Sequence, residues 1–556
     1  MPRQLRNRPQ LALRRPARLI DQPRQSAPAP DHHSGRKRSA ARPVATTAAA
    51  ALATIVAAMS TTDHCVIAID AGTTGVRSRA VFIDNRPPVF SYREFEQLYP
   101  QPGWVEHNPG EIWQAVLATL TDVVAAVGAA NVVAIGITNQ RETVVAWNRQ
   151  TGEPYGTAIV WQDRRTAARC AELEALGHLP LVRRQTGLVL DPYFSGSKFE
   201  WLLANRQIPV DADLALGTID SWLLWNLTGG QEHATDPTNA SRTMLFDITT
   251  MQWSTELCDL FNVPIAALPK VLPSSGRFGV TNPRCGAPAG IPISGIAGDQ
   301  QAALFGQACF EPGMAKNTYG TGSFVLLNVG AVCPEPTDGM LTTVAWTLAD
   351  GTVAYALEGA IFVTGAAIQW LRDGLQIIEQ SSDIGPLAAS VDDSGGVMVV
   401  PALTGLGSPW WDPYARGTII GITRGTNRGH IARAVIDSIT LQVRDAVRAM
   451  VQASGTEVVD LRVDGGASVM DLLLQLQADQ LGVVVQRPTD QETTALGAAF
   501  LAGLAEGFWP SLDAIAARWT LDAQFSPNAD RTVADALHGT WLRAVERSRA
   551  WAQPDR

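Results

Sequence analysis

Residues 66–84, VIAIDAGTTGVRSRAVFID, constrain the fold of this chain more than any other stretch. Two apolar runs rich in β-branched residues flank a turn of glycine and threonine, which predicts a strand, a tight turn and a second strand. The glycines let the backbone approach a bound group, and the threonines supply hydroxyl and amide donors. Asp70 adds a carboxylate where the first strand ends. Donors beside one carboxylate suit phosphate oxygens and Mg²⁺, although an ordinary hairpin also uses such glycines.

The same kind of turn recurs later in the chain. Residues 316–330 (KNTYGTGSFVLLNVG) place a Gly/Thr turn between two strand-like runs, and residues 461–479 (LRVDGGASVMDLLLQLQAD) read as strand, Gly-Gly turn and helix. Residues 291–306 (IPISGIAGDQQAALFG) combine an apolar strand, a Gly-flanked Asp299 and the start of a helix. We therefore expect an α/β protein with two similar halves, each contributing a phosphate-facing turn, and a cleft between them.

Three polar residues stand at the ends of predicted buried strands. Asp299 lies where a strand meets a helix, which places a carboxylate on rigid elements as a general base requires, although it could simply cap the helix. Arg141 and Glu142 interrupt two apolar runs within ITNQRET. In α/β proteins such a rim binds ligands, but a solvated ion pair on a turn would give the same pattern.

Composition separates the first 62 residues from the rest. They hold eleven basic and two acidic residues, a formal +9; because the whole chain carries −9, the remainder carries −18. An Arg-rich, Pro/Ala-rich arm buries too little apolar surface to fold, so we predict that it is disordered. We expect translation to begin at Met59, with a targeting arm as the alternative; the intact mass of the native protein would decide. Its uncharged run, residues 44–59, is short for a membrane span, so no stable membrane insertion is expected.

Three domains are expected: a basic arm over residues 1–62, a first folded domain over 63–310 and a second over 311–556. The six scattered cysteines form no CxxC pair, which argues against a disulfide framework or a zinc site and favours the cytoplasm. Only four of the 44 basic residues are lysines, a bias that reflects genome composition more than nucleic-acid binding. No nucleic-acid partner is expected.

The order of the glycine turns resembles the actin, hexokinase and Hsp70 type of ATP-binding fold, with two actin-like (ribonuclease H-like) domains. Residues 193–201 (YFSGSKFEW) and 417–437 (GTIIGITRGTNRGHIARAVID) resemble the two signature segments of the FGGY carbohydrate kinases. Further segments are similar to the branch of that family that phosphorylates glycerol: ITNQRET, AIVWQDRRT, DPYFSG, NASRTMLF, GIAGDQQAALFG, NTYGTGSF and ALEGAIFVTGAAIQWLRD. The similarity runs from about Cys65 to about Trp509.

The resemblance implies ATP-dependent phosphorylation of glycerol with Mg²⁺ as cofactor. It implies that Asp299 is the base that accepts the hydroxyl proton. The glycerol hydroxyls would be held by Arg141, Glu142, Tyr193, Asp299 and Gln300, with Trp161 and Phe324 against the carbon chain. The phosphates of ATP would be surrounded by Thr73, Thr74, Gly75, Arg77, Thr321 and Gly365. The nucleoside of ATP would lie near Gln369, Gly466 and Met470. Asp70 and Asp299 would approach Mg²⁺ through water.

The sequence departs from the family pattern at three positions. Ala71 stands where a glutamine is frequent, Gly75 where a serine is frequent, and Met470 where an asparagine lies near the adenine. Met470 can still cover a base by apolar contact, without a hydrogen bond. Two other functions remain open: a related kinase acting on a pentose or tetritol, and an actin- or Hsp70-like protein that uses ATP to change conformation. A homodimer or homotetramer is the family expectation.

Overall fold

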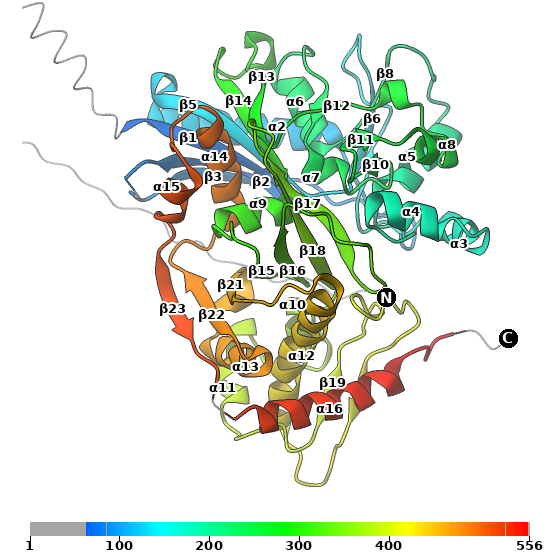
Figure 1. The fold of residues 1–556 in the computed structure, drawn as a ribbon, viewed down its shortest axis with the longest axis vertical. Coiled ribbons are helices and arrows are strands. Elements are labelled where there is room, and N and C mark those ends of the chain that lie inside the picture. The colour runs from blue at the N-terminus through cyan, green and yellow to red at the C-terminus, as the bar shows by residue number, and fades with distance from the viewer. Residues whose placement is uncertain (1–62, 85, 529, 554–556) are drawn as a thin grey trace, which may run out of the picture. The chain divides into compact units, whose positions relative to one another are not determined.

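The computed structural model describes residues 63–84, 86–528 and 530–553. The predicted basic arm and the predicted start at Met59 lie outside these residues. Two large sheets organise the described chain (Figure 1). The first has six strands in the order β13 (Ser275–Val280), β14 (Pro292–Gly298), β5 (Val132–Asn139), β1 (Cys65–Ala71), β2 (Gly75–Phe82) and β3 (Val89–Glu94).

The second sheet has seven strands. Their order is β17 (Leu341–Thr347), β18 (Val353–Ile361), β16 (Ser323–Gly330), β15 (Met314–Tyr319), β21 (Asp460–Asp464), β22 (Val484–Pro488) and β23 (Leu521–Phe525). In each sheet one central strand, β1 or β15, pairs antiparallel with the strand that follows it and parallel with a strand much later in the chain. The predicted pair of similar α/β halves is therefore confirmed.

Helices cover both faces of the first sheet. Ile67 and Ile69 of β1 pack toward α2 (Pro109–Val127), while Val66 and Ala68 pack toward α9 (Asp299–Gly306) and α14 (Thr493–Ala505). Burial on both faces explains why β1 is a continuous apolar run. The sequence Asn108-Pro109-Gly110-Glu111 predicts a helix start with Asn108 as its cap, and the structure confirms it: the Asn108 side chain accepts a hydrogen bond from the backbone amide of Gly110 at 2.9 Å. Among the described helices α2 alone is long and apolar enough to cross a membrane, and it packs on β2 and β3.

The second sheet is covered by helices from its own half. α12 (Arg428–Ser454) and α13 (Asp471–Leu481) pack on it, with α10 (Gly365–Gln369) and α11 (Ile384–Ala388) in the same core, and α16 (Arg531–Ser548) packs on α12 and α13. The remaining short helix of this half is α15 (Leu512–Ala516). The segment FVTGAAIQWLRD predicts one helix over about residues 361–373, and this prediction is wrong. Strand β18 extends to Ile361, α10 begins at Gly365, and the last turn is a π-helix over Trp370–Gly374.

A smaller unit is formed mainly by the chain between β5 and β13 of the first sheet, and β4 joins it from the segment between β3 and α2. It contains a four-stranded sheet in the order β4 (Glu106–His107), β7 (Ala158–Ile159), β6 (Val144–Asn148) and β8 (Leu214–Thr218). Its helices are α3 (Ala167–Ala175), α4 (Leu179–Thr186), α5 (Ser195–Asn205), α6 (Ile219–Leu227), α7 (Pro237–Ala240) and α8 (Thr255–Leu260). Two-stranded ladders are β9 (Ala234–Thr235) with β12 (Lys270–Val271), β10 (Phe246–Asp247) with β11 (Gln252–Trp253), and β19 (Met398–Val400) with β20 (Thr418–Ile420).

The two halves are joined by the crossing of α9 and α14. A Cβ atom on Gly497 would overlap the carbonyl oxygen of Ala302, and one on Gly306 would overlap that of Thr493. Glycine is therefore required at both positions by the close approach of the two backbones. Since α14 follows β22 of the second sheet but packs on β1, β5 and β14 of the first, the halves share one core.

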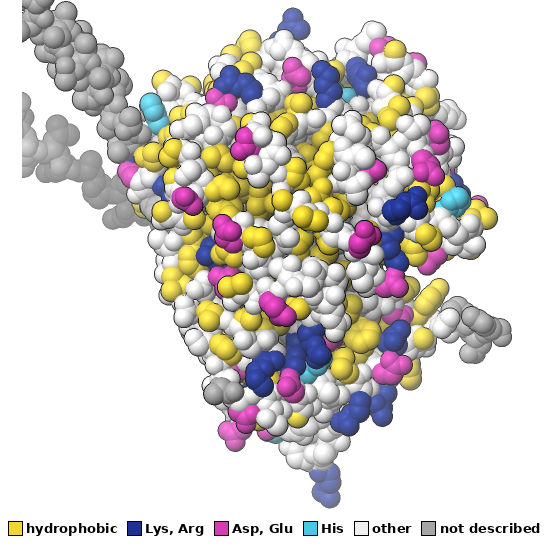
Figure 2. Space-filling view, viewed as in Figure 1, with side chains coloured by type: hydrophobic (Ala, Val, Ile, Leu, Met, Phe, Trp, Pro, Cys, Tyr) yellow, Lys and Arg dark blue, Asp and Glu magenta, His cyan; other side chains and the backbone are white. Residues whose placement is uncertain are grey.

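Charge is mixed on the surface in view. Figure 2 shows acidic and basic side chains interspersed over this face, with hydrophobic side chains gathered between them in the upper half. The negative charge of the folded part is therefore not concentrated in a single patch of this face.

Candidate active site

Arg141 lies at the centre of the candidate site. It follows the carboxyl end of β5 and is 2% exposed. Its Nε lies 3.1 Å from Asp299 Oδ1, Nη1 donates to Gln301 Oε1 at 3.1 Å, and Nη2 donates to Tyr193 Oη at 3.4 Å. Three of the predicted substrate residues, Arg141, Tyr193 and Asp299, are thus brought together from separate segments.

A carboxylate that sequence reasoning missed pairs with Arg141. Glu358 of β18 is fully buried and accepts from Arg141 Nη1 at 2.5 Å and from Nη2 at 3.1 Å. Arg242, also fully buried, donates to Glu358 Oε1 at 2.8 Å and to Glu142 Oε1 at 2.7 Å. Two guanidiniums and two carboxylates therefore form one closed network. Because Arg141 and Glu142 are each 2% exposed, the alternative of a solvated ion pair is wrong.

The two buried carboxylates differ in their electrostatics. Burial opposes ionisation of Glu358, but Arg141 and Arg242 outweigh it and lower the pKa of this group to about 2. For Glu142 burial dominates and raises the pKa despite the same arginines. Glu142 also has a positive φ of 61°, the left-handed region that non-glycine residues seldom adopt. Its carbonyl is held by Ser195 Oγ at 3.1 Å, so this unusual backbone is fixed from α5.

Asp299 is the first residue of α9, directly after β14. Its carboxylate accepts a hydrogen bond from the backbone amide of Gln300 at 2.7 Å and faces Arg141. The Asp299 side chain is 31% exposed. The helix has no side-chain cap from its N-cap residue, Gly298. A fixed carboxylate that keeps an exposed edge can accept a proton from a bound hydroxyl. Gln300 is 8% exposed, and its amide oxygen accepts a hydrogen bond from Lys316 Nζ.

Three aromatic rings meet beside this cluster, as predicted for two of them. The Trp161 ring centroid lies 5.7 Å from that of Tyr193 and 6.5 Å from that of Phe324, both in edge-on contacts. Trp161 Nε1 also donates to Thr73 Oγ1 at 3.0 Å. Trp161 belongs to the smaller unit, Phe324 to the second sheet and Thr73 to the first Gly/Thr turn. The aromatic residues therefore connect the predicted substrate residues to the predicted phosphate residues.

The first Gly/Thr turn presents Asp70 near Asp299. Burial raises the pKa of Asp70 to about 7, and the Asp299 and Glu492 carboxylates add to this effect. Arg77 lies opposite Asp70 in the β1/β2 register, so both side chains share one face of the sheet. A Cβ atom on Gly75 would lie 2.5 Å from Tyr92 Oη, so packing against β3 alone accounts for glycine at this position.

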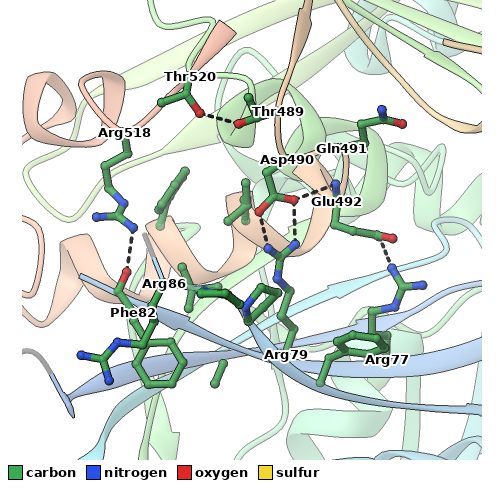
Figure 3. Close-up of a pocket in the computed structure, with 17 residues that line it drawn as sticks. Arg77, Arg79, Phe82, Arg86, Thr489, Asp490, Gln491, Glu492, Arg518 and Thr520 are labelled. Atoms are coloured by element: carbon green, nitrogen blue, oxygen red, sulfur yellow. Dashed lines mark hydrogen bonds and ion pairs between the residues drawn. The ribbon is translucent and has the colours of Figure 1, made fainter. Parts of the chain in front are cut away.

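Arg77 already has a partner in the structure. Figure 3 shows it paired with Glu492, while the neighbouring Arg79 donates to Asp490 at 2.9 Å. Both carboxylates lie between β22 and α14, so these pairs join the two halves. They line a cavity of about 660 Å³ together with Arg518. Thr74, by contrast, is exposed at the tip of its turn.

The second Gly/Thr turn is joined to the start of α10. The Gly365 amide donates to Gly320 O at 3.0 Å, and the Thr364 amide donates to Thr321 O at 2.9 Å. A Cβ atom on Gly365 would lie 2.7 Å from Gly320 O. Thr321 and Gly365 therefore lie side by side, and their contact with phosphates stays a prediction. This turn repeats the first one, since each closes an antiparallel hairpin at the end of a central strand.

The predicted nucleoside residues are less closely connected. Gln369 ends α10 with an exposed side chain, and Met470 is partly buried before α13. Gly466 follows Gly465, whose φ is 87°, and a Cβ atom on Gly466 would meet nothing within 4 Å. Within the described part of the chain, no hydrogen bond or ion pair links these three residues to one another. Their role toward the nucleoside stays a prediction.

Two α/β halves with the same pairing around their central strand, each with a Gly/Thr turn beside a shared carboxylate and arginine cluster, define a nucleotide-binding fold of the actin type. Residues 65–306 match the N-terminal domain, and residues 315–506 the C-terminal domain, of the FGGY family of carbohydrate kinases. The chain belongs to this family.

Similar proteins cover nearly all of the folded part. A glycerol kinase of Symbiobacterium thermophilum is 54% identical over 493 residues, 88% of this chain and 99% of that protein. Glycerol kinase 2 of Thermotoga maritima is 52% identical over 87% of this chain and 99% of its own length. The crystal structure of Plasmodium falciparum glycerol kinase with ADP superposes with a TM-score of 0.82 at 34% identity, covering 87% of this chain and 98% of that one. A gluconate kinase from Lactobacillus acidophilus, at 22% identity and a TM-score of 0.78, shares the fold.

Proposed function

We propose that the protein transfers the terminal phosphoryl group of ATP to glycerol and forms sn-glycerol 3-phosphate. The observation that carries the proposal is the Asp299 carboxylate, fixed by Arg141 beside Tyr193 yet still partly exposed. Relatives named glycerol kinase, more than 50% identical over 99% of their length, support glycerol as the acceptor. The Plasmodium falciparum glycerol kinase was crystallised with ADP, which supports a nucleotide donor.

In the proposed reaction Asp299 accepts the proton of the terminal hydroxyl as that oxygen attacks the phosphorus. Phosphoryl transfer depends mainly on in-line positioning and on neutralising charge, so the amides of the two Gly/Thr turns and Arg77 would hold the phosphates. Thr73, Thr74, Thr321 and Gly365 belong to those turns. Arg141, Glu142, Tyr193 and Gln300 would orient the acceptor hydroxyls, and Trp161 and Phe324 would limit its width.

The residues near Asp70 fit a Mg²⁺ ion. Asp70 near the end of β1 and Asp299 directly after β14 lie beside the end of β5, which pairs with both strands, and the Asp299 carboxylate adds to the raised pKa of Asp70. Mg²⁺ supplies positive charge at such a place when bound with substrate phosphates. The described residues contain no group of three side chains that could enclose a metal, so phosphate oxygens and water would complete the coordination. Asp70 and Asp299 are the residues that would hold the ion, directly or through water.

We further propose a cytoplasmic location and a homodimer or homotetramer. All six cysteines are free in the structure and five are buried, which suits a reducing compartment. Light scattering on the purified protein measures the mass of the assembly and so tests the second proposal. A monomer at micromolar concentration would contradict it.

Acceptor kinetics test the proposed function. kcat/KM is measured for glycerol, dihydroxyacetone, erythritol and D-xylulose on the wild type and on Glu142→Ala, with ATP and Mg²⁺. We expect glycerol to be preferred, and Glu142→Ala to cost about 1 to 3 kcal/mol of transition-state binding because a hydroxyl partner is lost. Preference for D-xylulose, or unchanged glycerol kinetics in Glu142→Ala, would contradict the proposal. ATP turnover without any acceptor requirement would favour a conformational ATPase.

A further inference from the structure

Lys316 is a fully buried lysine that the proposed reaction does not use. It lies on β15, is 0% exposed and forms no ion pair with a described carboxylate. Burial lowers the pKa of Lys316 to about 8, although the Asp464 and Asp299 carboxylates oppose the shift. A buried amine without an ion-pair partner is unfavourable for folding unless its hydrogen bonds compensate. The hydrogen bonds of the Lys316 amine should therefore be important for the structure around it.

The hydrogen bonds of Lys316 fix the orientation of a neighbouring amide. Its Nζ donates to Gln300 Oε1 and, at 3.0 Å, to Thr318 Oγ1. Oxygen and nitrogen of a glutamine amide are easily exchanged in a structure, but lysine has only donors. The atom that faces Nζ must therefore be the oxygen. Gln300 Nε2 must then point elsewhere, and among the described residues it has no hydrogen-bond partner.

The residue that carries this free amide nitrogen directly follows the proposed base in the chain. Gln300 follows Asp299 at the start of α9, and α9 packs on β15. An ionised carboxylate only accepts hydrogen bonds, whereas Nε2 only donates them. A hydroxyl group can donate one hydrogen bond and accept another. Asp299 and Gln300 Nε2 together thus offer the two complementary partners of an alcohol.

We propose that Lys316 is a positioning residue that makes Gln300 a hydrogen-bond donor to a substrate hydroxyl. It acts through Gln300 and touches no substrate. This inference rests on the proposed function, which places an acceptor hydroxyl beside Asp299. It adds a basis for selectivity: the acceptor must present an oxygen that accepts from Nε2, and a compound lacking that hydroxyl leaves the amide unpaired.

A double-mutant cycle tests the proposal. Lys316→Met, Gln300→Ala and the double variant are compared for KM of glycerol, kcat, and Kd of ADP measured by calorimetry. We expect each single change to raise KM of glycerol roughly tenfold, with kcat and Kd of ADP within about twofold of wild type. The double variant should match Gln300→Ala within about twofold, because the two residues act as one unit. Lys270→Met, on the exposed side of β12, is the matched control and should change nothing.

Multiplicative effects on KM in the double variant, or an unchanged KM in Lys316→Met, would overturn the proposal. Should Lys316→Met fail to fold, Gln300→Glu carries the test. A carboxylate there pairs with Lys316 and keeps the fold, shown by an unchanged or raised Tm, but it cannot donate to a hydroxyl. KM of glycerol should then rise at least tenfold, and wild-type KM in Gln300→Glu would refute the inference. If the wild type prefers another acceptor, the proposed function fails, and the same cycle on that acceptor still decides the role of Lys316.

Discussion

Glu358 shows how much of the candidate site depends on a single side chain. One buried carboxylate pairs with both Arg141 and Arg242, and Arg242 in turn pairs with Glu142. Without Glu358 the two buried guanidiniums would keep only Glu142 and the partly exposed Asp299 as carboxylate partners. Removing one partner of a buried ion pair leaves an uncompensated charge, which is far more harmful than replacing the whole pair.

Glu358→Gln should therefore destabilise the protein by about 3 to 5 kcal/mol and weaken glycerol binding, because Arg141 loses its fixed position. Urea unfolding measures the first effect and KM of glycerol the second. The control is Glu172→Gln: Glu172 forms a surface pair with Arg169, and its loss should stay within about 0.5 kcal/mol. Equal effects of the two changes would contradict the importance of the buried network.

Asp299→Asn keeps the shape of the side chain but removes the group that accepts the proton. Turnover should fall by roughly 10²-fold or more, while ADP binds as before. Steady-state kinetics and calorimetry with ADP give the two values. Unchanged turnover would leave Asp299 a purely structural role at the start of α9.

Asp220 gives a prediction for pH. Burial raises the pKa of this carboxyl to about 7, although hydrogen bonds from Thr218 and Thr235 oppose the shift. Between about pH 4 and pH 7 the folded protein keeps a proton that the unfolded chain has lost, so stability should fall as pH rises through this range. Asp220→Asn should flatten the fall, as measured by Tm between pH 4.5 and pH 7.5. If Tm of the variant falls with pH as steeply as Tm of the wild type, other buried carboxyl groups cause the effect.

Residue roles could be predicted only where local context reveals them. Arg141, Glu142 and Asp299 stand at the ends of apolar strands, and the sequence pattern indicates such positions directly. Glu358 and Arg242 form their contacts with residues at least 100 positions away, which no local pattern contains. One local signal was present, since Glu358 interrupts the apolar strand YALEGAIF and a charge there needs a buried partner. The distances that identify Lys316 and Gln300 as a pair required the structure.

At the level of elements, strands and caps were predicted well and one helix was not. Apolar runs and the Asn108 cap predicted β1, β5 and α2, because burial and capping are local. The segment after β18 was predicted as one helix from residue 361. Instead, β18 continues to Ile361 in pairing with Ser323, so tertiary pairing prevails over the helical pattern. The crossing of α9 and α14 depends on glycines that no helix propensity would favour.

Gly497→Ala should destabilise the protein by about 1 to 3 kcal/mol, since the added methyl group must push α14 away from Ala302. The matched control is Gly539→Ala in α16, where a Cβ atom would meet nothing within 4 Å. Replacing glycine at that open helical position should raise the free energy of unfolding of the protein by about 0.4 to 1 kcal/mol. Opposite signs of the change in Tm are the expected result, and a stabilising Gly497→Ala would show that the crossing has spare room.

At the scale of the whole molecule, the two similar α/β halves were predictable but the sharing of one core was not. Three glycine turns in sequence indicate two similar halves. That α14 leaves the second half to cover β1 and β5 of the first is a matter of tertiary packing alone. The domain division at residue 310 stays a prediction, although the family matches end and begin at residues 306 and 315.

A fragment of residues 63–310 should consequently not fold to a native state by itself. Without α14, the apolar face formed by Val66, Ala68 and Ala134 lacks its cover. We expect it to aggregate or to bind a hydrophobic dye, and residues 63–553, which keep α14 and α16, to do neither. A soluble monomeric fragment with cooperative unfolding would contradict this expectation.

The packing of α14 also has a consequence for the order of synthesis. The strands of the first sheet leave the ribosome early, but the helix that covers one of their faces is translated only after most of the second half. Until then α9 is the only helix of the described chain that has been made to pack on this face. We therefore expect the nascent protein to carry a partly uncovered apolar surface for most of its translation, and any dependence on chaperones to follow the time spent in this state.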